Sequence, residues 1–240
     1  MEPELDPLAA IGPQLVTILR RRVIRNELLA GSRISEAEIA RQFNISRQPV
    51  REAFIKLAQE GLIEVRPQRG TVVRTIALSE VLDARFVREA VEADIVRIVA
   101  ASADKATVAI LREELRQQQV LARSTPEEFI RADERFHRTL ADAAGQRSVW
   151  DILQGLKAQM DRVRFLSFEL DTCDRLIAQH TEIVDGIAER DSGGAEAALR
   201  RHLRAVLEDL PEIMRAHPGV FDTALPEKAA AFNPTERRTR

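Results

Sequence analysis

Cysteine, long apolar runs and net charge are all scarce in this 240-residue chain, and each scarcity excludes a class of protein. A single cysteine, Cys173, excludes an internal disulfide framework and suits a reducing compartment. No apolar run approaches the ~20 residues that a membrane span needs, and no signal-like segment opens the chain. We therefore expect a soluble, cytoplasmic protein that does not contact a membrane.

The small formal net charge of −2 argues by itself against a nucleic-acid-binding protein. The charges are unevenly distributed, however. Residues 13–76 carry 12 basic and 6 acidic side chains, whereas residues 77–240 carry 24 basic and 29 acidic ones. A basic N-terminal half next to an acidic C-terminal half is the pattern expected when one domain binds nucleic acid.

Two short helices joined by a tight turn are predicted between residues 34 and 61. Ser35 and Glu38 form a capping-box pattern at the start of the first helix, and Asn44 suits the left-handed turn that ends it. Ser46 is expected to cap the second helix, with Pro49 in its first turn and Gly61 after its end. This layout is typical of a helix-turn-helix, although a plain helical hairpin in a larger all-α core has the same spacing.

The second helix of a helix-turn-helix places its N-terminal side chains at base edges in the DNA major groove. Arg47 and Arg51 lie one turn apart at that end, and each can offer a bidentate fork to guanine. Gln48, between them, can contact adenine or a phosphate. The next segment, LIEVRPQRGTVV, has the alternation and glycine-containing turn of a β-hairpin, with Arg66 and Arg69 at its tip. A basic hairpin after a recognition helix is typical of a two-stranded wing.

The run SRQPVREAFIKLAQEGLIEVRPQRG, with the LLAGSRISEAEIARQFNI that precedes it, resembles the DNA-binding domain of GntR-type bacterial transcription regulators. A base-contacting arginine of some members is replaced near Ala37, and Arg33 or Arg41 can compensate. The resemblance implies a winged helix-turn-helix that binds a near-palindromic operator as a homodimer. The DNA-contacting residues that we predict are Arg33, Arg41, Ser46, Arg47, Gln48, Arg51, Arg69 and Gly70.

The rest of the chain has no strand signal and predicts an all-α six-helix bundle. We expect a flexible lead-in at residues 1–12, a DNA-binding domain of three helices and a wing at 13–76, the bundle at 77–218, and a disordered tail at 219–240. The fold class is therefore mostly α. The six helices are expected at about residues 79–102, 104–123, 125–144, 147–170, 172–190 and 195–216.

Histidine is the scarce residue that carries chemistry in the bundle. Asp133 and His137 are four residues apart and therefore project from one face of a helix. His180 and His202 lie in two other helices, and bundles build metal sites from such inward-facing residues. One carboxylate and three imidazoles suit Zn²⁺, Ni²⁺, Fe²⁺ or Mn²⁺. Spacing alone does not show that they converge, because each histidine could equally be an ordinary surface or core residue.

The segments ADERFH, QHTEIVDGIAERD and AALRRHL resemble the helical effector-binding domain of the FadR-type branch of GntR regulators. Asp133, His137, His180 and His202 match positions that bind metal, Zn²⁺ above all, in metal-containing members. Six helices point to the VanR-like subgroup. The family implies small carboxylates as effectors, and Arg88, Arg162 and Arg164 are the side chains that we predict to bind one.

Three functions from different classes remain at this point: a transcription regulator, a metalloenzyme, and an interaction module that does not bind DNA. The first is a transcription regulator, presumed to be a repressor, whose operator affinity is controlled by a small organic or sugar acid bound at the metal site. The second is a metal-dependent hydrolase or lyase, since an Asp/His₃ site can activate water. The second hypothesis leaves the winged domain unexplained, and no general base stands beside the four residues in the sequence.

Overall fold

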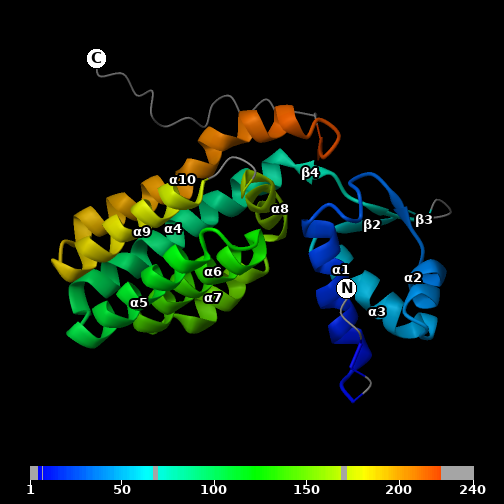
Figure 1. Ribbon diagram of the computed structural model, residues 1–240, viewed down its shortest axis with the longest axis horizontal. Helices are drawn as coiled ribbons and strands as arrows, with labels where there is room; N and C mark the ends of the chain where they lie inside the picture. Colours follow the sequence, from blue (N-terminus) through cyan, green and yellow to red (C-terminus); the bar gives the residue numbers. More distant parts are fainter. Residues whose placement is uncertain (1–4, 7, 67–69, 169–171, 223–240) are drawn as a thin grey trace.

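A computed structural model describes residues 5–6, 8–66, 70–168 and 172–222, which form an N-terminal head and a helical bundle (Figure 1). The head contains α1 (Ile11–Ile24), α2 (Glu36–Gln42) and α3 (Arg47–Gln59). Three strands, β1 (Arg33–Ile34), β2 (Ile63–Arg66) and β3 (Gly70–Val73), pair in the order β1-β3-β2. The mostly α fold class and the winged head are as predicted, and β1 adds a third strand to the expected wing.

Local signals explain the elements of the head. Ser35 accepts the amide hydrogen bond of Glu38 at 3.2 Å and so caps α2, and Asn44 has a φ of 52° in the turn. Ser46 occupies the N-cap position of α3, but its hydroxyl makes no capping hydrogen bond. Apolar side chains at helical spacing, among them Leu15, Leu19, Val50, Phe54 and Leu57, are buried in a shared core.

Seven helices form the described part of the bundle. They are α4 (Leu78–Ser102), α5 (Lys105–Leu121), α6 (Pro126–Ala143), α7 (Arg147–Gln154), α8 (Ala158–Ser167), α9 (Cys173–Ala188) and α10 (Ser192–Ala216). The prediction of six helices was therefore wrong in one place, because the expected helix 147–170 is divided into α7 and α8. The helix count consequently no longer supports the VanR-like subgroup.

The break between α7 and α8 falls at Gly155. Glycine in a helix interior costs ~1 kcal/mol relative to alanine, so a helix divides there when packing favours two directions. Trp150 and Leu153 of α7 are buried in the bundle core. In contrast, Gln159 of α8 donates a hydrogen bond to the Gly61 carbonyl of the head at 2.6 Å. The break therefore allows α8 to contact the head.

A short parallel sheet joins the start of the bundle to its end. β4 (Ile76–Ala77) pairs with β5 (Phe221–Asp222), and Ile76, Val220 and Phe221 are buried with residues of α8 and α10. The expectation of a disordered tail from residue 219 was thus wrong up to residue 222, because apolar burial orders this segment. Residues 223–240 lie outside the described residues, as do residues 1–4 and 7 of the expected lead-in.

Candidate metal centre and DNA-binding surface

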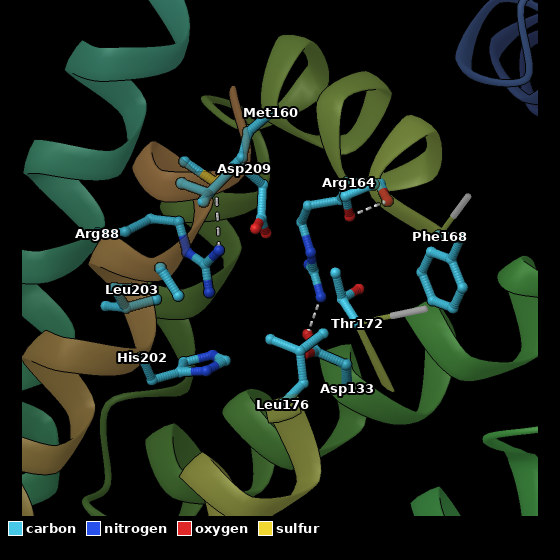
Figure 2. Close-up of a pocket in the computed structure, with 13 residues that line it drawn as sticks. Arg88, Asp133, Met160, Arg164, Phe168, Thr172, Leu176, His202, Leu203 and Asp209 are labelled. Atoms are coloured by element: carbon cyan, nitrogen blue, oxygen red, sulfur yellow. Dashed lines mark hydrogen bonds and ion pairs between the residues drawn. The ribbon is translucent and has the colours of Figure 1, made fainter. Parts of the chain in front are cut away.

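A small cavity of about 50 Å³ lies inside the bundle, where α4, α6, α8, α9 and α10 meet. Polar side chains on its wall include Arg88, Asp133, Arg164, His202 and a second carboxylate, Asp209, which is paired with Arg175 (Figure 2). Arg88 is buried and paired with Glu92 at 2.6 Å, while Arg164 forms an ion pair with Asp133. Two cations therefore border a cavity that has room for only a few water molecules.

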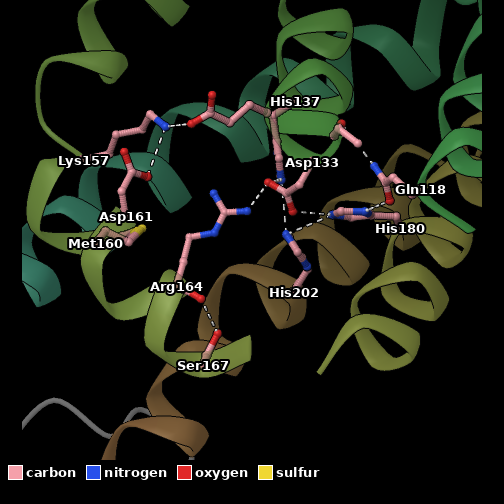
Figure 3. Close-up of polar contacts among 12 residues, drawn as sticks. Gln118, Asp133, His137, Lys157, Met160, Asp161, Arg164, Ser167, His180 and His202 are labelled. Atoms are coloured by element: carbon pink, nitrogen blue, oxygen red, sulfur yellow. Dashed lines mark hydrogen bonds and ion pairs between the residues drawn. The ribbon is translucent and has the colours of Figure 1, made fainter. Parts of the chain in front are cut away.

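Beside this cavity, the four predicted ligand residues converge from three helices (Figure 3). Asp133 and His137 come from α6, His180 from α9 and His202 from α10. One potential ligand atom from each lies within 4.8 Å of the other three, and all four residues are buried. The i, i+4 spacing on α6 stacks Asp133 and His137 on the same inward face.

Each imidazole turns its Nε2 atom toward the centre of this cluster. The Nε2 atom of His202 lies 3.2 Å from that of His137 and 3.2 Å from that of His180. The Nδ1 atoms face outward. His180 Nδ1 is 2.7 Å from Gln118 Oε1, His202 Nδ1 is 3.1 Å from Gln179 Oε1, and His137 Nδ1 is 2.7 Å from Glu92 Oε2.

These outer contacts determine which nitrogen carries the proton. Amide oxygens accept hydrogen bonds, so the Nδ1 atoms of His180 and His202 are donors and the Nε2 atom of each neutral ring has a free lone pair. His137 Nδ1 lies 2.7 Å from Glu92 Oε2 but makes no hydrogen bond with the described residues. Burial lowers the pKa of His180 to about 3 and that of His202 well below its ordinary value, so both rings are neutral near pH 7. The structure therefore brings together three imidazole rings and a carboxylate, the donor set of a metal ion.

The charges around the cluster favour an ionised carboxylate. Burial acts to raise the pKa of Asp133, but the Arg164 guanidinium and the nearby imidazoles outweigh it and hold that pKa well below its usual range. Glu92 behaves in the same way, since Arg88 and His137 outweigh its burial and lower its pKa to about 2. Asp133 Oδ1 accepts no hydrogen bond from the described residues, so it is free to bind a cation.

Sequence reasoning missed the three residues that orient the imidazoles, Glu92, Gln118 and Gln179. A signal for Gln118 was present, because it continues the buried stripe of Leu111 and Leu115 on α5. A polar residue on an apolar helix stripe needs a buried partner, and here the partner is His180. Glu92 similarly shares a buried stripe of α4 with Val96 and Val99.

One predicted effector residue, Arg162, does not border the cavity. Its guanidinium donates to the Arg74 carbonyl at 2.7 Å and to Gln159 Oε1 at 3.2 Å, and burial lowers its pKa to about 10. Positions 162 and 164 are separated by roughly 200° around a helix. Arg164 therefore faces the cavity while Arg162 faces the head, so the predicted effector role of Arg162 has no support from this cavity.

The predicted DNA-contacting residues lie on the exposed surface of the head. Ser46, Arg47, Gln48 and Arg51 are exposed around the start of α3, and Arg51 makes only a 3.4 Å contact with Glu36. Arg41 is exposed in the last turn of α2, and Arg33 is exposed on β1. Gly70, at the start of β3, has a φ of 85°, which favours glycine in the turn. Arg69 lies outside the described residues.

Comparison with known proteins identifies the family of each of the two domains. Residues 13–73 match the family described as "Bacterial regulatory proteins, gntR family", and residues 83–205 match the FCD domain. The "HTH-type transcriptional repressor RspR" of Escherichia coli (strain K12) is 35% identical over 223 residues, covering 92% of this chain and 98% of that protein. A transcriptional regulator of Streptomyces ambofaciens, named for an unstable DNA locus, is 39% identical over 206 residues, covering 85% and 87%.

Among solved structures, E. coli McbR/YncC matches the fold with a TM-score of 0.68 at 16% identity, covering 88% of this chain and all of that one. The chain belongs to the GntR family of bacterial regulatory proteins, in the branch with a FadR-like FCD domain. It is accordingly a DNA-binding transcription regulator and not an enzyme, so the hydrolase or lyase hypothesis is excluded. None of the helices in the described ranges is long and apolar enough to cross a membrane.

Proposed function

We propose that this regulator is a repressor whose operator affinity is controlled by a small organic or sugar acid, bound beside a metal ion in the FCD domain. Asp133, His137, His180 and His202 would hold the metal, which would supply a Lewis-acidic binding position for an effector carboxylate. Zn²⁺ suits a set of three nitrogens and one oxygen, and Ni²⁺, Fe²⁺ and Mn²⁺ are alternatives. The repressor function is supported by the name of the E. coli relative.

The observation that carries this proposal is that His202 Nε2 lies 3.2 Å from the Nε2 atoms of both His137 and His180. His180 and His202 are neutral rings with their protons on Nδ1, so they cannot form a hydrogen bond with each other through Nε2. A buried group of acceptors without donors is costly, and a cation at their centre removes that cost. The outward contacts to Glu92, Gln118 and Gln179 are the kind that orient metal-bound histidines.

Arg164 and Arg88 are the side chains that we assign to the effector. Both are held at the cavity by a single carboxylate, Asp133 and Glu92 respectively. A guanidinium can bind a carboxylate through two parallel hydrogen bonds, so either arginine can recognise one end of an acid. A bound metal would share the charge of Asp133 and leave Arg164 available to the ligand.

Helix α8 would connect the effector to the head. A cavity of about 50 Å³ is too small for an acid of several carbons, so Arg164 and Met160 of α8 must move to admit one. The same helix holds the head through the bonds of Gln159 to Gly61 and of Arg162 to Arg74. Displacement of α8 on one side therefore strains its hydrogen bonds on the other, and a coupling of ~1–3 kcal/mol is enough for a switch.

We further infer that the protein acts as a homodimer on a near-palindromic operator. Two heads must then meet half-sites about one helical turn apart, or a multiple of it. Arg33, Arg41, Ser46, Arg47, Gln48, Arg51, Arg69 and Gly70 are the DNA-contacting residues that we assign. A change in the angle between head and bundle would alter the separation of the two recognition helices.

An effector screen on the metal-loaded protein tests the control step. We expect a hydroxy acid or sugar acid that raises the melting temperature also to weaken binding of the DNA upstream of the regulator's own gene, measured by fluorescence anisotropy. Arg164→Ala should abolish both responses, whereas Arg112→Ala, on the exposed face of α5, should keep them. An acid that stabilises the protein and leaves DNA affinity unchanged would contradict the proposed control.

Replacing Arg162 with methionine should uncouple the head from the bundle. The substitution removes the hydrogen bond to the Arg74 carbonyl and leaves this acceptor without that donor, at a cost of about 1–3 kcal/mol. We expect calorimetry to resolve two unfolding transitions in the variant where the wild type shows one. Arg112→Met is the matched control, and a single unchanged transition in Arg162→Met would argue against this role.

A further inference from the structure

A second and larger cavity lies between the head and the bundle. Its volume is about 570 Å³, and its walls come from α1 and the end of α3 on one side and from α6, α7 and α8 on the other. In Figure 1, α1 faces the bundle beside α8. No residue lines both this cavity and the small cavity at the histidine cluster, so the two are separate.

The walls of the interdomain cavity carry an excess of positive charge. Six cationic side chains and four acidic ones line it. All four acids are already paired with three of the cations. Arg20 binds Glu60 at 2.7 Å, Arg25 forms an ion pair with Glu127, and Lys157 forms ion pairs with Glu134 and Asp161.

The three remaining cations are Arg21, Lys56 and Arg131, and none forms an ion pair or side-chain hydrogen bond in the described parts of the chain. Arg131 has only a weaker electrostatic attraction to Glu128, whose pKa it helps to lower. Arg21 and Lys56 belong to the head, whereas Arg131 belongs to the bundle. The Nε atom of Arg21 is buried and has no hydrogen-bond acceptor among the described residues. A buried donor without an acceptor is costly, so this position favours a ligand that supplies one.

The volume of the interdomain cavity and its other lining residues indicate what kind of ligand fits it. A volume of about 570 Å³ lies within the usual range for small-molecule sites, ~300–1,000 Å³. Ile24, Ile130 and Phe165 add apolar surface between the charged groups. Three unpaired cations require more than one negative charge, and arginine forks match phosphate oxygens.

We propose that the interdomain cavity is a second ligand site, which binds a phosphate-bearing small molecule through Arg21, Lys56 and Arg131. Such a ligand contacts both domains at once and therefore stabilises one orientation of the head. The two sites share no residue, but α8 lines both, so we expect the two ligands to act on the same orientation of the head. None of the residues that we assign to DNA lines this cavity, and Lys56 lies near the opposite end of α3, so a bound ligand leaves the N-terminal end of the recognition helix free.

The test uses inorganic pyrophosphate as the probe and isothermal titration calorimetry of the full-length protein. The protein is first treated with a chelator and dialysed, so that the probe cannot act by removing a metal ion. We expect measurable binding to the wild type. Arg21→Ala combined with Arg131→Ala should weaken it at least about tenfold, while the conservative Arg21→Lys with Arg131→Lys retains most of it.

Three further variants decide between locations of the probe. Arg112→Ala should bind as the wild type does, which excludes a non-specific loss of charge. His137→Ala should also bind normally, so this result stays separate from any failure of the metal proposal. If Arg47→Ala with Arg51→Ala abolished pyrophosphate binding, the probe would be on the recognition helix and the proposal would be wrong. Absence of binding to the wild type at millimolar pyrophosphate would equally overturn it.

Discussion

Replacing Arg47 and Arg51 together with alanine is expected to reduce operator affinity by about 30-fold to 10⁴-fold. Each bidentate contact of an arginine with guanine is worth ~1–3 kcal/mol, and the two are one turn apart at the start of α3. The loss should be larger for the operator than for unrelated DNA, because base contacts are lost together with charge. Fluorescence anisotropy on both DNAs, at several salt concentrations, measures the two effects separately.

Stability should change little in this double variant. Both side chains are exposed, and their one ion-pair partner among the described residues is Glu36, which lies 3.4 Å from Arg51. Exposed pairs of this kind contribute ~0–1 kcal/mol. Arg112→Ala serves as the control for loss of a single exposed arginine outside the head. If the double variant bound the operator with unchanged affinity and salt dependence, α3 would not be the recognition helix.

Replacing His202 with alanine is expected to abolish stoichiometric metal binding. His202 supplies the Nε2 atom that lies 3.2 Å from both other imidazoles, so its removal opens the centre of the cluster. Loss of a residue that only orients a metal-bound histidine costs about 10- to 100-fold in metal affinity, and loss of a histidine that binds the metal should cost more. Gln118→Ala, which removes the partner of His180, should therefore have the smaller effect of the two.

Metal content by mass spectrometry and Zn²⁺ titration calorimetry test this ranking. His217→Ala is the matched control, because His217 is the one histidine outside the cluster. In the wild type, free Zn²⁺ at 100 times its Kd should stabilise the protein by about 2.7 kcal/mol, and His202→Ala should lose that gain. A full equivalent of metal in His202→Ala, bound as tightly as in the wild type, would rule out this centre.

The proposed switch distinguishes two roles for the metal, one that stabilises the bundle and one that binds the effector. If the metal only stabilised the bundle, His202→Ala would lower the melting temperature and leave the response to an effector acid intact in whatever protein remained folded. If the metal binds the acid, that response disappears even where the variant is folded. Thermal unfolding and operator binding measured on the same sample separate these two roles.

Much of the fold followed from short-range patterns in the sequence. The capping serine of α2, the left-handed Asn44 and the 3.6-residue spacing of Val50, Phe54 and Leu57 each act within a few residues. They defined the helix-turn-helix without knowledge of its neighbours. The same holds for the pairing of Asp133 with His137, because a four-residue interval on a helix places both on one face.

Features that depend on the direction of a helix could not be predicted from short-range sequence patterns. An apolar pattern running from Arg147 onward does not show that the helix divides at Gly155, since the division depends on what α7 and α8 contact. Arg162 and Arg164 look equivalent in sequence, yet one holds the Arg74 carbonyl and the other faces Asp133. The order of residues 220–222 likewise depends on burial against α8 and α10.

The sequence alone was therefore sufficient for the family and the helix-turn-helix, because motif and spacing are local properties, and the resemblance to that family pointed to the four residues of the histidine cluster. Tertiary packing was needed to bring the three Nε2 atoms together, to supply Glu92, Gln118 and Gln179 as their partners, and to form the interdomain cavity. The physical reason is that each of these features requires side chains from separate helices to meet, and their distance is set by how the helices pack, not by where they stand in the chain.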